Sequence, residues 1–347
     1  METLNLGIIG GCGSSGTTLL IHLLSRHPEI CSGPEFNCFN HKELYCYSEL
    51  SSKYSRMFKG QASASGYFAT HWFLTEPDYY GVTLDILQQW IKNSTDTPSF
   101  VENVVDHVKK RFNSRFFIEK TPSNVYCFQN LAQTFPDVPL IHIIRDGRDV
   151  VCSLMKRGYN LFGAGSRWLY DTLCGIALRG FDNYIEIKYE DLVSEPVATL
   201  KLLFRHLKIP FDSEILENNL KSSDHGWHID HFSTTHETTK AWRHKPSDPI
   251  QRSSIGRYKA EMRYAELATL HKICLSKTAS IDLGITKFSF GDLLEKLGYA
   301  GNDFDPERRL GSELKNKFME IQDYYRRIRM NWDAGYIGLP KIYTLIG

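Results

Sequence analysis

The stretch from Leu6 to Pro28, LGIIGGCGSSGTTLLIHLLSRHP, constrains the fold more than any other part of the chain. A short apolar run closed by glycines is typical of a buried parallel strand. The residues after Gly16 place leucines on one helical face, and Pro28 ends that helix. Strand, glycine-rich turn and helix in this order predict the first unit of an α/β sheet.

The turn itself indicates an anion site. Its glycines let consecutive backbone N–H groups approach an anion, and the following helix adds the positive end of its dipole. Hydroxyls come from Ser14, Ser15, Thr17 and Thr18. Thr17 stands where a nucleotide-triphosphate loop has lysine, so cleavage of a triphosphate is disfavoured. The alternative is a glycine-rich turn that binds nothing.

Later segments repeat the alternation of strand and helix. Phe116–Ile118, Leu140–Ile144 and the stretch NYIEIKYEDL predict three further strands, and helices are predicted over Arg148–Arg157 and EPVATLKLLFRHLKI. This alternation predicts an α/β fold with a P-loop-type parallel sheet flanked by helices on both faces. Ligands of such sheets bind at the carboxyl ends of the strands, where this chain has its most polar clusters.

For the rest of the chain, the sequence mainly predicts helices that are added to this sheet. Residues 31–115 show no strong strand signal and predict a largely helical insertion between the first two strands. Ser254–Leu275 predicts one helix, and residues 222–249, rich in histidine, predict a long loop or lid. We therefore expect an α/β domain over residues 1–287 and a helical C-terminal extension over residues 288–347.

Composition excludes several classes of partner. The net charge is +1, so no global field favours nucleic acid or a membrane surface. There is no run of about 18 apolar residues and no basic, apolar leader, which predicts a cytoplasmic protein without a membrane segment. The eight cysteines form no CxxC pair and no Cys/His cluster with zinc spacing. We expect reduced, buried thiols and no metal site.

A second cluster of basic and hydroxyl side chains lies in IIRDGRDVVCSLMKR. Arg145 closes a strand, and Ser153 and Arg157 lie four residues apart on the next helix. Two guanidinium forks and one hydroxyl are suited to a second phosphate. The alternative is a surface salt-bridge network with Asp146 and Asp149.

These segments together resemble the sulfotransferase family. GSSGTTLL is similar to its 5′-phosphosulfate loop, IIRDGRDVVCSL to its 3′-phosphate motif, and YEDLVSEP to a segment of Golgi-type and bacterial members. SIGRYK is a weaker match to a late cofactor-contacting segment, so the resemblance extends from about Leu6 to Met262. It implies 3′-phosphoadenosine 5′-phosphosulfate (PAPS) as donor, adenosine 3′,5′-bisphosphate as product and no metal. It also accounts for two phosphate sites and for the absent loop lysine.

The resemblance also implies roles for single residues. Ser14 stands where family members carry Lys or Arg, and Lys120, in EKTPSN, matches a family lysine that would stabilise charge on the sulfuryl group. Glu35 lines up with the glutamate base of tyrosylprotein, some carbohydrate and some bacterial members. Alternative bases are His41, His225, His228, His231 and His236.

The predicted function is transfer of a sulfuryl group to a hydroxyl or amine of a small-molecule acceptor by in-line displacement, and we expect an acceptor of specialised metabolism. The catalytic candidates are Glu35 and Lys120. The candidate cofactor-binding residues are Gly13, Ser14, Ser15, Gly16, Thr17, Thr18, Arg145, Ser153, Arg157, Tyr189 and Arg257. Segments Asn37–Lys110 and Ser222–Pro249 are expected to form the acceptor pocket. A small-molecule kinase and a nucleotide-binding protein without catalysis remain the alternatives.

Overall fold

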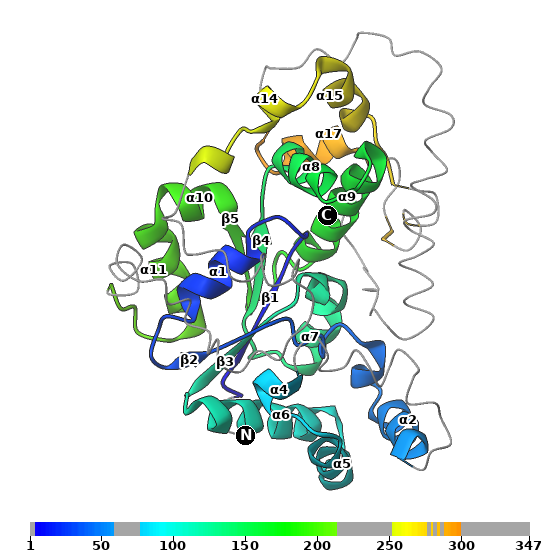
Figure 1. Cartoon of the computed structure of the whole chain (residues 1–347), viewed down its shortest axis with the longest axis vertical. Helices are drawn as coiled ribbons and strands as arrows, with labels where there is room; N and C mark the ends of the chain where they lie inside the picture. The colour runs from blue at the N-terminus through cyan, green and yellow to red at the C-terminus, as the bar shows by residue number, and fades with distance from the viewer. Residues whose placement is uncertain are drawn as a thin grey trace.

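A computed structural model of the chain describes residues 4–58, 77–213, 252–275, 279, 283–284 and 288–299. Its centre is a five-stranded parallel sheet in the order β2-β3-β1-β4-β5, seen in Figure 1. The strands are β1 (Leu6–Gly10), β2 (Ile30–Cys31), β3 (Phe116–Lys120), β4 (Leu140–Ile144) and β5 (Tyr184–Lys188). The predicted α/β class and the four longer strands are confirmed.

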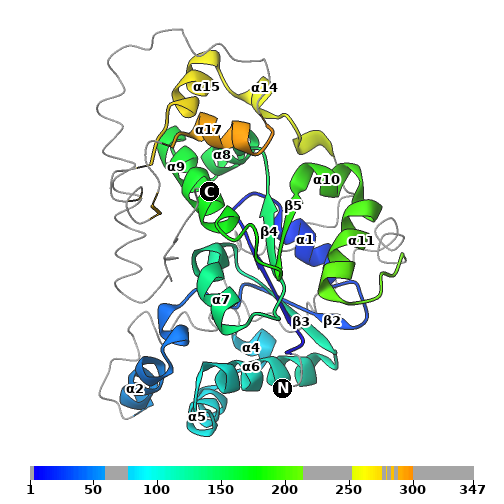
Figure 2. The same ribbon diagram turned by 180° about the vertical axis from the view of Figure 1, so that it is seen from behind.

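Both faces of the sheet are apolar because successive side chains of each strand point to opposite faces. Ile9, Ile141 and Ile143 belong to one buried cluster, whereas Ile8, Leu140 and Ile144 belong to the other. Helices α1 (Thr17–Leu24) and α11 (Pro196–Leu207) contribute to the first cluster. Helices α6 (Thr97–Phe112), α7 (Phe128–Thr134) and α9 (Leu161–Ile176) contribute to the second. Figures 1 and 2 show α1 and α11 on one side of the strands and α7 and α9 on the other.

In its described part the insertion before β3 is largely helical, as predicted, but it begins with a strand that the sequence did not reveal. β2 pairs with the start of β3, Ile30 opposite Phe116 and Cys31 opposite Phe117. Two residues are too few to show a periodic pattern. The other described elements of the insertion, besides α6, are the 3₁₀ helix η1 (Lys42–Tyr45), α2 (Tyr47–Phe58), α4 (Pro77–Tyr80) and α5 (Leu84–Asn93).

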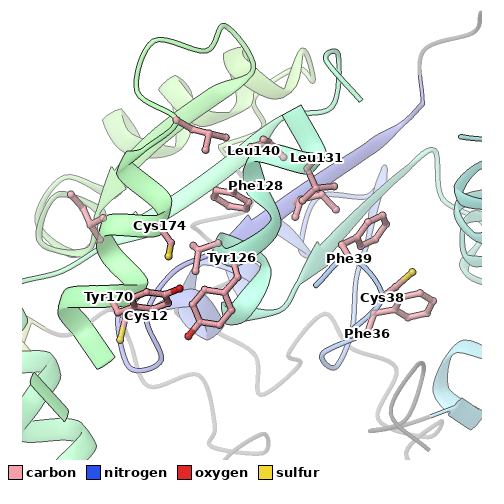
Figure 3. Close-up of a cluster of buried hydrophobic side chains, with 14 of the residues drawn as sticks. Cys12, Phe36, Cys38, Phe39, Tyr126, Phe128, Leu131, Leu140, Tyr170 and Cys174 are labelled. Atoms are coloured by element: carbon pink, nitrogen blue, oxygen red, sulfur yellow. The ribbon is translucent and has the colours of Figure 1, made fainter. Parts of the chain in front are cut away.

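The insertion shares its core with the sheet. Phe36, Cys38 and Phe39 belong to the same buried cluster as Tyr126 and Phe128, as Figure 3 shows. All eight cysteines are unpaired. Six of them are buried, which confirms the expected burial of most thiols: Cys12, Cys31, Cys38, Cys127, Cys152 and Cys174.

The second half of the fold follows β4. Helix α8 (Gly147–Lys156) leads into α9, and β5 leads into α10 (Tyr189–Ser194) and α11. Before β4, the 3₁₀ helix η2 (Pro122–Cys127) connects β3 to α7. Helices α7 and α9 have no counterpart in the sequence prediction.

The predicted continuous helix over Ser254–Leu275 is wrong. The segment forms η5 (Arg252–Ser254), α14 (Tyr258–Glu261) and α15 (Tyr264–His271). Met262 has an extended ψ of 136°, and Arg263 then caps α15, donating its backbone N–H to the Glu266 carboxylate. Beyond it, α17 (Phe290–Lys296) packs Phe290 on Trp168 with 4.4 Å between ring centroids. The residues after 299 lie outside the described part, so the proposed domain boundary stays a prediction.

Candidate functional site

The candidate site lies at the carboxyl edge of the three central strands. β1 leads into the glycine-rich loop, β3 ends at Lys120, and β4 ends directly before Arg145. β1 lies between β3 and β4 in the sheet, so these three ends are adjacent. The chain continues from β1 to β2 and β3 on one side of β1 and then crosses to β4 and β5 on the other. Open α/β sheets bind ligands where the strand order reverses in this way.

The glycine-rich loop between β1 and α1 turns tightly at Gly16. Gly16 has φ 100°, in the left-handed region, and immediately precedes the first residue of α1. A Cβ at this position would lie 2.5 Å from Cδ2 of Tyr189, so glycine is required sterically as well. The ring of Tyr189 therefore packs directly against the loop.

The predicted hydroxyls of this loop differ in exposure. Ser15 and Thr17 are buried, whereas Ser14 and Thr18 are partly exposed. The backbone N–H of Ser15 donates to the carbonyl of Cys12 at 3.0 Å, which closes the turn. Ser15 Oγ is buried and has no hydrogen-bond partner within the described residues.

The two catalytic candidates form an ion pair. Lys120 Nζ lies 3.0 Å from Glu35 Oε1. The Lys120 side chain is 5% exposed and that of Glu35 is 38% exposed. The carboxylate thus reaches solvent while the ammonium is enclosed at the end of β3, an arrangement in which a substrate can approach the carboxylate.

Buried hydrogen bonds fix the segment that carries Glu35. The backbone N–H of Phe36 donates to Glu119 Oε1 at 3.1 Å, and that of Asn37 donates to Thr121 Oγ1 at 3.2 Å. Asn124 Nδ2 donates both to Glu119 Oε2 and to the Ile9 carbonyl. Glu119 therefore joins the segment that carries Glu35 to β1 and β3. Its burial raises its pKa to about 7, although its hydrogen-bond donors oppose the shift.

Helix α4 holds the same segment from the other side. Tyr79 Oη donates to the Ser32 carbonyl at 2.7 Å, and Tyr80 Oη donates to the Pro34 carbonyl at 2.5 Å. The backbone on both sides of Glu35 is thereby anchored. A base on such a segment is positioned before substrate binds.

Arg145 connects the loop, the start of α10 and the segment before α14. Its Nη1 donates to the Ser14 carbonyl at 3.2 Å, and its Nη2 donates to the Ser254 carbonyl at 2.5 Å. Its Cζ lies 4.3 Å from the centroid of the Tyr189 ring. Arg145 is buried and 3.8 Å from Asp149, so the expected alternative of a surface network does not describe it.

The other predicted donors also gather here. Arg157 follows the last residue of α8, and its Nη1 lies 3.4 Å from Ser14 Oγ. Arg257 Nη2 donates to Ser254 Oγ at 3.2 Å. Ser153 lies on α8, one turn before Arg157, and is partly exposed. The structure thus brings the separate sequence motifs to one edge of the sheet.

Asp149 holds the segment SIGRYK, residues 254–259, at the site. Its buried carboxylate accepts the backbone N–H of Gly256 at 2.7 Å and that of Tyr258 at 3.1 Å. Desolvation raises the pKa of Asp149, and these two bonds oppose that shift. The neighbouring Arg148 contacts other residues: it pairs with Asp146 at 2.7 Å and donates a hydrogen bond to the Tyr299 carbonyl.

Sequence reasoning missed Arg167, which lies on α9. Its Nη2 is 3.2 Å from the place that a Cβ on Gly13 would take. Its Nε is 3.4 Å from Asp171, one helical turn later, and its Nη1 donates to Tyr159 Oη. The Arg/Asp pair at spacing i, i+4 within the apolar run SRWLYDTL was the available signal.

Several predictions fall elsewhere. His41, an alternative base, is buried six residues after Glu35. The histidines at 225, 228, 231 and 236 and the expected lid lie outside the described residues. In the described ranges no three His, Cys, Asp or Glu side chains gather as a metal site would require. No helix there has the length and apolar character to cross a bilayer.

Comparison with known proteins agrees with this arrangement. A family model described as "Sulfotransferase family" matches residues 8–213, and one described as "Sulfotransferase domain" matches residues 162–282. The chain is 24% identical over 220 residues to protein-tyrosine sulfotransferase 1 of Danio rerio, covering 60% of this chain and 55% of that protein. It is 25% identical over 224 residues to protein-tyrosine sulfotransferase A of Caenorhabditis elegans, covering 60% and 51%. The chain thus spans about half the length of these curated relatives.

The fold has a counterpart among solved structures. The sulfotransferase domain of the olefin synthase of Synechococcus PCC 7002 superposes with a TM-score of 0.50 at 21% identity, covering 75% of this chain and 89% of that domain. The first family match includes the glycine-rich loop, Glu35, Lys120 and Arg145. The chain belongs to the sulfotransferase family.

Proposed function

We propose that this protein transfers a sulfuryl group from PAPS to a hydroxyl or amine of an acceptor. The observation that carries the proposal is the Lys120–Glu35 pair at the end of β3, next to the glycine-rich loop at the end of β1. A cation for the leaving charge and a carboxylate for the acceptor proton are the two groups that this reaction requires.

The residues present are suited to a donor with two separate phosphate groups. Ser15 Oγ, Arg145 Nε and Arg257 Nε are buried donors without a hydrogen-bond partner in the described part of the chain. The loop from Gly13 to Thr18 would hold the 5′-phosphosulfate. Arg145, Ser153 and Arg157 would hold the 3′-phosphate, with Tyr189 beneath Arg145 and Arg257 as a further donor.

PAPS supplies the sulfuryl group. The acceptor oxygen or nitrogen forms a bond to sulfur as the bond between sulfur and the 5′-phosphate oxygen breaks, and adenosine 3′,5′-bisphosphate leaves. Glu35 accepts the proton that the acceptor loses. Lys120 stabilises the negative charge that grows on the departing phosphate oxygen. No residue in this scheme requires a metal.

For the acceptor we propose a small molecule, and for the protein a cytoplasmic location. The relatives named above act on protein tyrosine, so a tyrosine side chain in a polypeptide is the second candidate. Both acceptors present a hydroxyl to Glu35. Incubation with PAPS and either small phenols and alcohols or tyrosine-containing peptides, read by mass spectrometry, separates the two.

The proposal is tested by nucleotide protection of the full chain. Adenosine 3′,5′-bisphosphate at 100 times its Kd should add about 2.7 kcal/mol to the unfolding free energy and raise the melting temperature. ATP with Mg²⁺ at the same concentration should raise it far less. An equal or larger effect of ATP with Mg²⁺ would favour the kinase alternative. Binding of the bisphosphate without any turnover of PAPS would favour a nucleotide-binding protein.

A further inference from the structure

The glycine-rich loop has no cationic side chain of its own. From Gly10 to Thr18 it contains only glycine, cysteine, serine and threonine. Backbone amides and hydroxyls can surround an anion, but a group with more than one negative charge is bound more strongly when full positive charges lie nearby. Any such charge must come from another part of the fold.

Two guanidinium groups reach this loop from outside it. Arg157 Nη1 lies 3.4 Å from Ser14 Oγ. A Cβ built on Gly13 would lie 3.2 Å from Arg167 Nη2 and 3.7 Å from Arg157 Nη1. Both guanidinium groups therefore lie against the same residue, and a Cβ there would crowd Arg167 but make only ordinary contact with Arg157.

The position of Arg167 is fixed by its neighbours. Asp171 accepts from Arg167 Nε at 3.4 Å and is itself buried, where it also accepts from Tyr126 Oη. Tyr159 Oη accepts from Arg167 Nη1 at 2.5 Å. The Arg167 side chain remains 23% exposed. Asp171 and Tyr159 thus hold Arg167 in place while it still reaches solvent. The side chain would lose little conformational entropy when it binds a ligand.

The two guanidinium groups repel each other. The pKa of Arg157 is lowered by burial and next by the charge of Arg167, while Glu35 opposes the shift. Holding like charges this close is unfavourable, and a bound anionic donor relieves the repulsion. The arrangement is therefore that of an anion-binding site whose free form carries excess positive charge.

We propose that Arg167, beside Arg157, provides the positive charge of the 5′-phosphosulfate site that the loop lacks at Ser14. This inference rests on the proposed function. Arg167 is assigned as a donor-binding residue that contacts the 5′-phosphate oxygens, in addition to the predicted set. In this chain the cation is carried by α9 instead of by the loop.

The test uses two nucleotides that differ only in the 5′-phosphate. The ratio of the Kd of adenosine 3′-monophosphate to that of adenosine 3′,5′-bisphosphate, from titration calorimetry on the full chain, measures how much the 5′-phosphate contributes. Arg167→Met should lower this ratio about 10- to 100-fold, as expected for loss of a charged hydrogen-bond donor. The Kd of the 3′-monophosphate should not change.

Three further variants make the result specific. Arg115→Met removes an exposed arginine that pairs with Glu29 before β3, and it should leave the ratio unchanged. Arg167→Lys keeps a charge and should retain part of the ratio. The double variant Ser14→Lys, Arg167→Met should recover most of the wild-type ratio, because it places an ammonium on the loop.

Two outcomes would overturn the inference: an unchanged ratio in Arg167→Met and Arg167→Lys, or equal weakening of both nucleotides, as a purely structural role would give. Failure of the wild-type protein to prefer the bisphosphate over ATP with Mg²⁺ would instead refute the proposed function. The two failures are therefore distinguishable.

Discussion

The ammonium of Lys120 and the carboxylate of Glu35 lie 3.0 Å apart, although 85 residues separate them in the chain. The pair joins the end of a sheet strand to a loop that follows the first helix. Lys120 is enclosed, whereas Glu35 is partly exposed. A substrate can therefore replace Lys120 as the hydrogen-bond partner of the Glu35 carboxylate without unfolding of the site. Tests of this pair are the most direct tests of the proposed chemistry.

Glu35→Gln should lower kcat by about 10²- to 10⁴-fold, because an amide cannot accept the acceptor's proton. Binding of adenosine 3′,5′-bisphosphate should be preserved, which calorimetry can check. Glu29→Gln is the matched control, since Glu29 pairs with Arg115 away from the loop. If Glu35→Gln turns over normally, the base is another residue, and His41 is the first to examine.

Lys120→Met should lower kcat by about 10²- to 10³-fold, the effect of removing one donor to a developing negative charge. Glu35 is partly exposed and can be solvated in this variant, so folding should persist. Lys156→Met serves for comparison, because Lys156 is exposed and pairs with Glu261 at 2.6 Å. Comparable kinetics of the two lysine variants would remove Lys120 from the mechanism.

Gly16→Ala and Gly180→Ala form a matched pair for the loop. Both glycines have φ 100°, but a Cβ at Gly180 meets no atom within 4 Å, whereas one at Gly16 meets the Tyr189 ring. Gly180→Ala should destabilise by about 1–2 kcal/mol from the left-handed conformation alone. Gly16→Ala should cost about 1–3 kcal/mol more from overpacking. Equal melting temperatures would show that Tyr189 is not tightly packed on the loop.

Glu119→Gln should change how stability depends on pH. The carboxylate has a pKa of about 7 in the folded protein and an ordinary value of 4.5. The folded state therefore binds more protons between these values, and its stability falls as pH rises from about 5 to 8. The advantage of wild type over Glu119→Gln in unfolding free energy should shrink by roughly 2–3 kcal/mol across this range. A constant difference would show that Glu119 is not protonated on folding.

The sequence predicted the parts of the fold that have strong local signals. Glycines with an apolar strand before them and an apolar helix after them located β1, the loop and α1. β2 was missed because a two-residue strand is defined by its partner β3, not by a pattern of its own. The break at Met262 was missed because the apolar residues on both sides continue a helical period.

The site was predictable where a residue stands at the end of a strand. Lys120 and Arg145 were found in this way, whereas Glu35 was identified from the family resemblance. Arg167 was not found, because its contact with Gly13 depends on how α9 packs across the sheet, and its i, i+4 spacing from Asp171 does not reveal that contact. Glu119 lies next to Lys120 in the sequence, but its carboxylate is buried and holds the segment that carries Glu35.

Arg167 and Trp168 are neighbours on α9, and each touches a different part of the site. Trp168 Nε1 donates to the Arg145 carbonyl at 3.1 Å, while Arg167 lies against Gly13. Two consecutive residues of α9 thus fix the distance between the glycine-rich loop and the segment that begins at Arg145. We expect discrimination between positional isomers of the nucleotide, such as adenosine 2′,5′-bisphosphate, because a different phosphate spacing would require displacement of the fully buried Trp168.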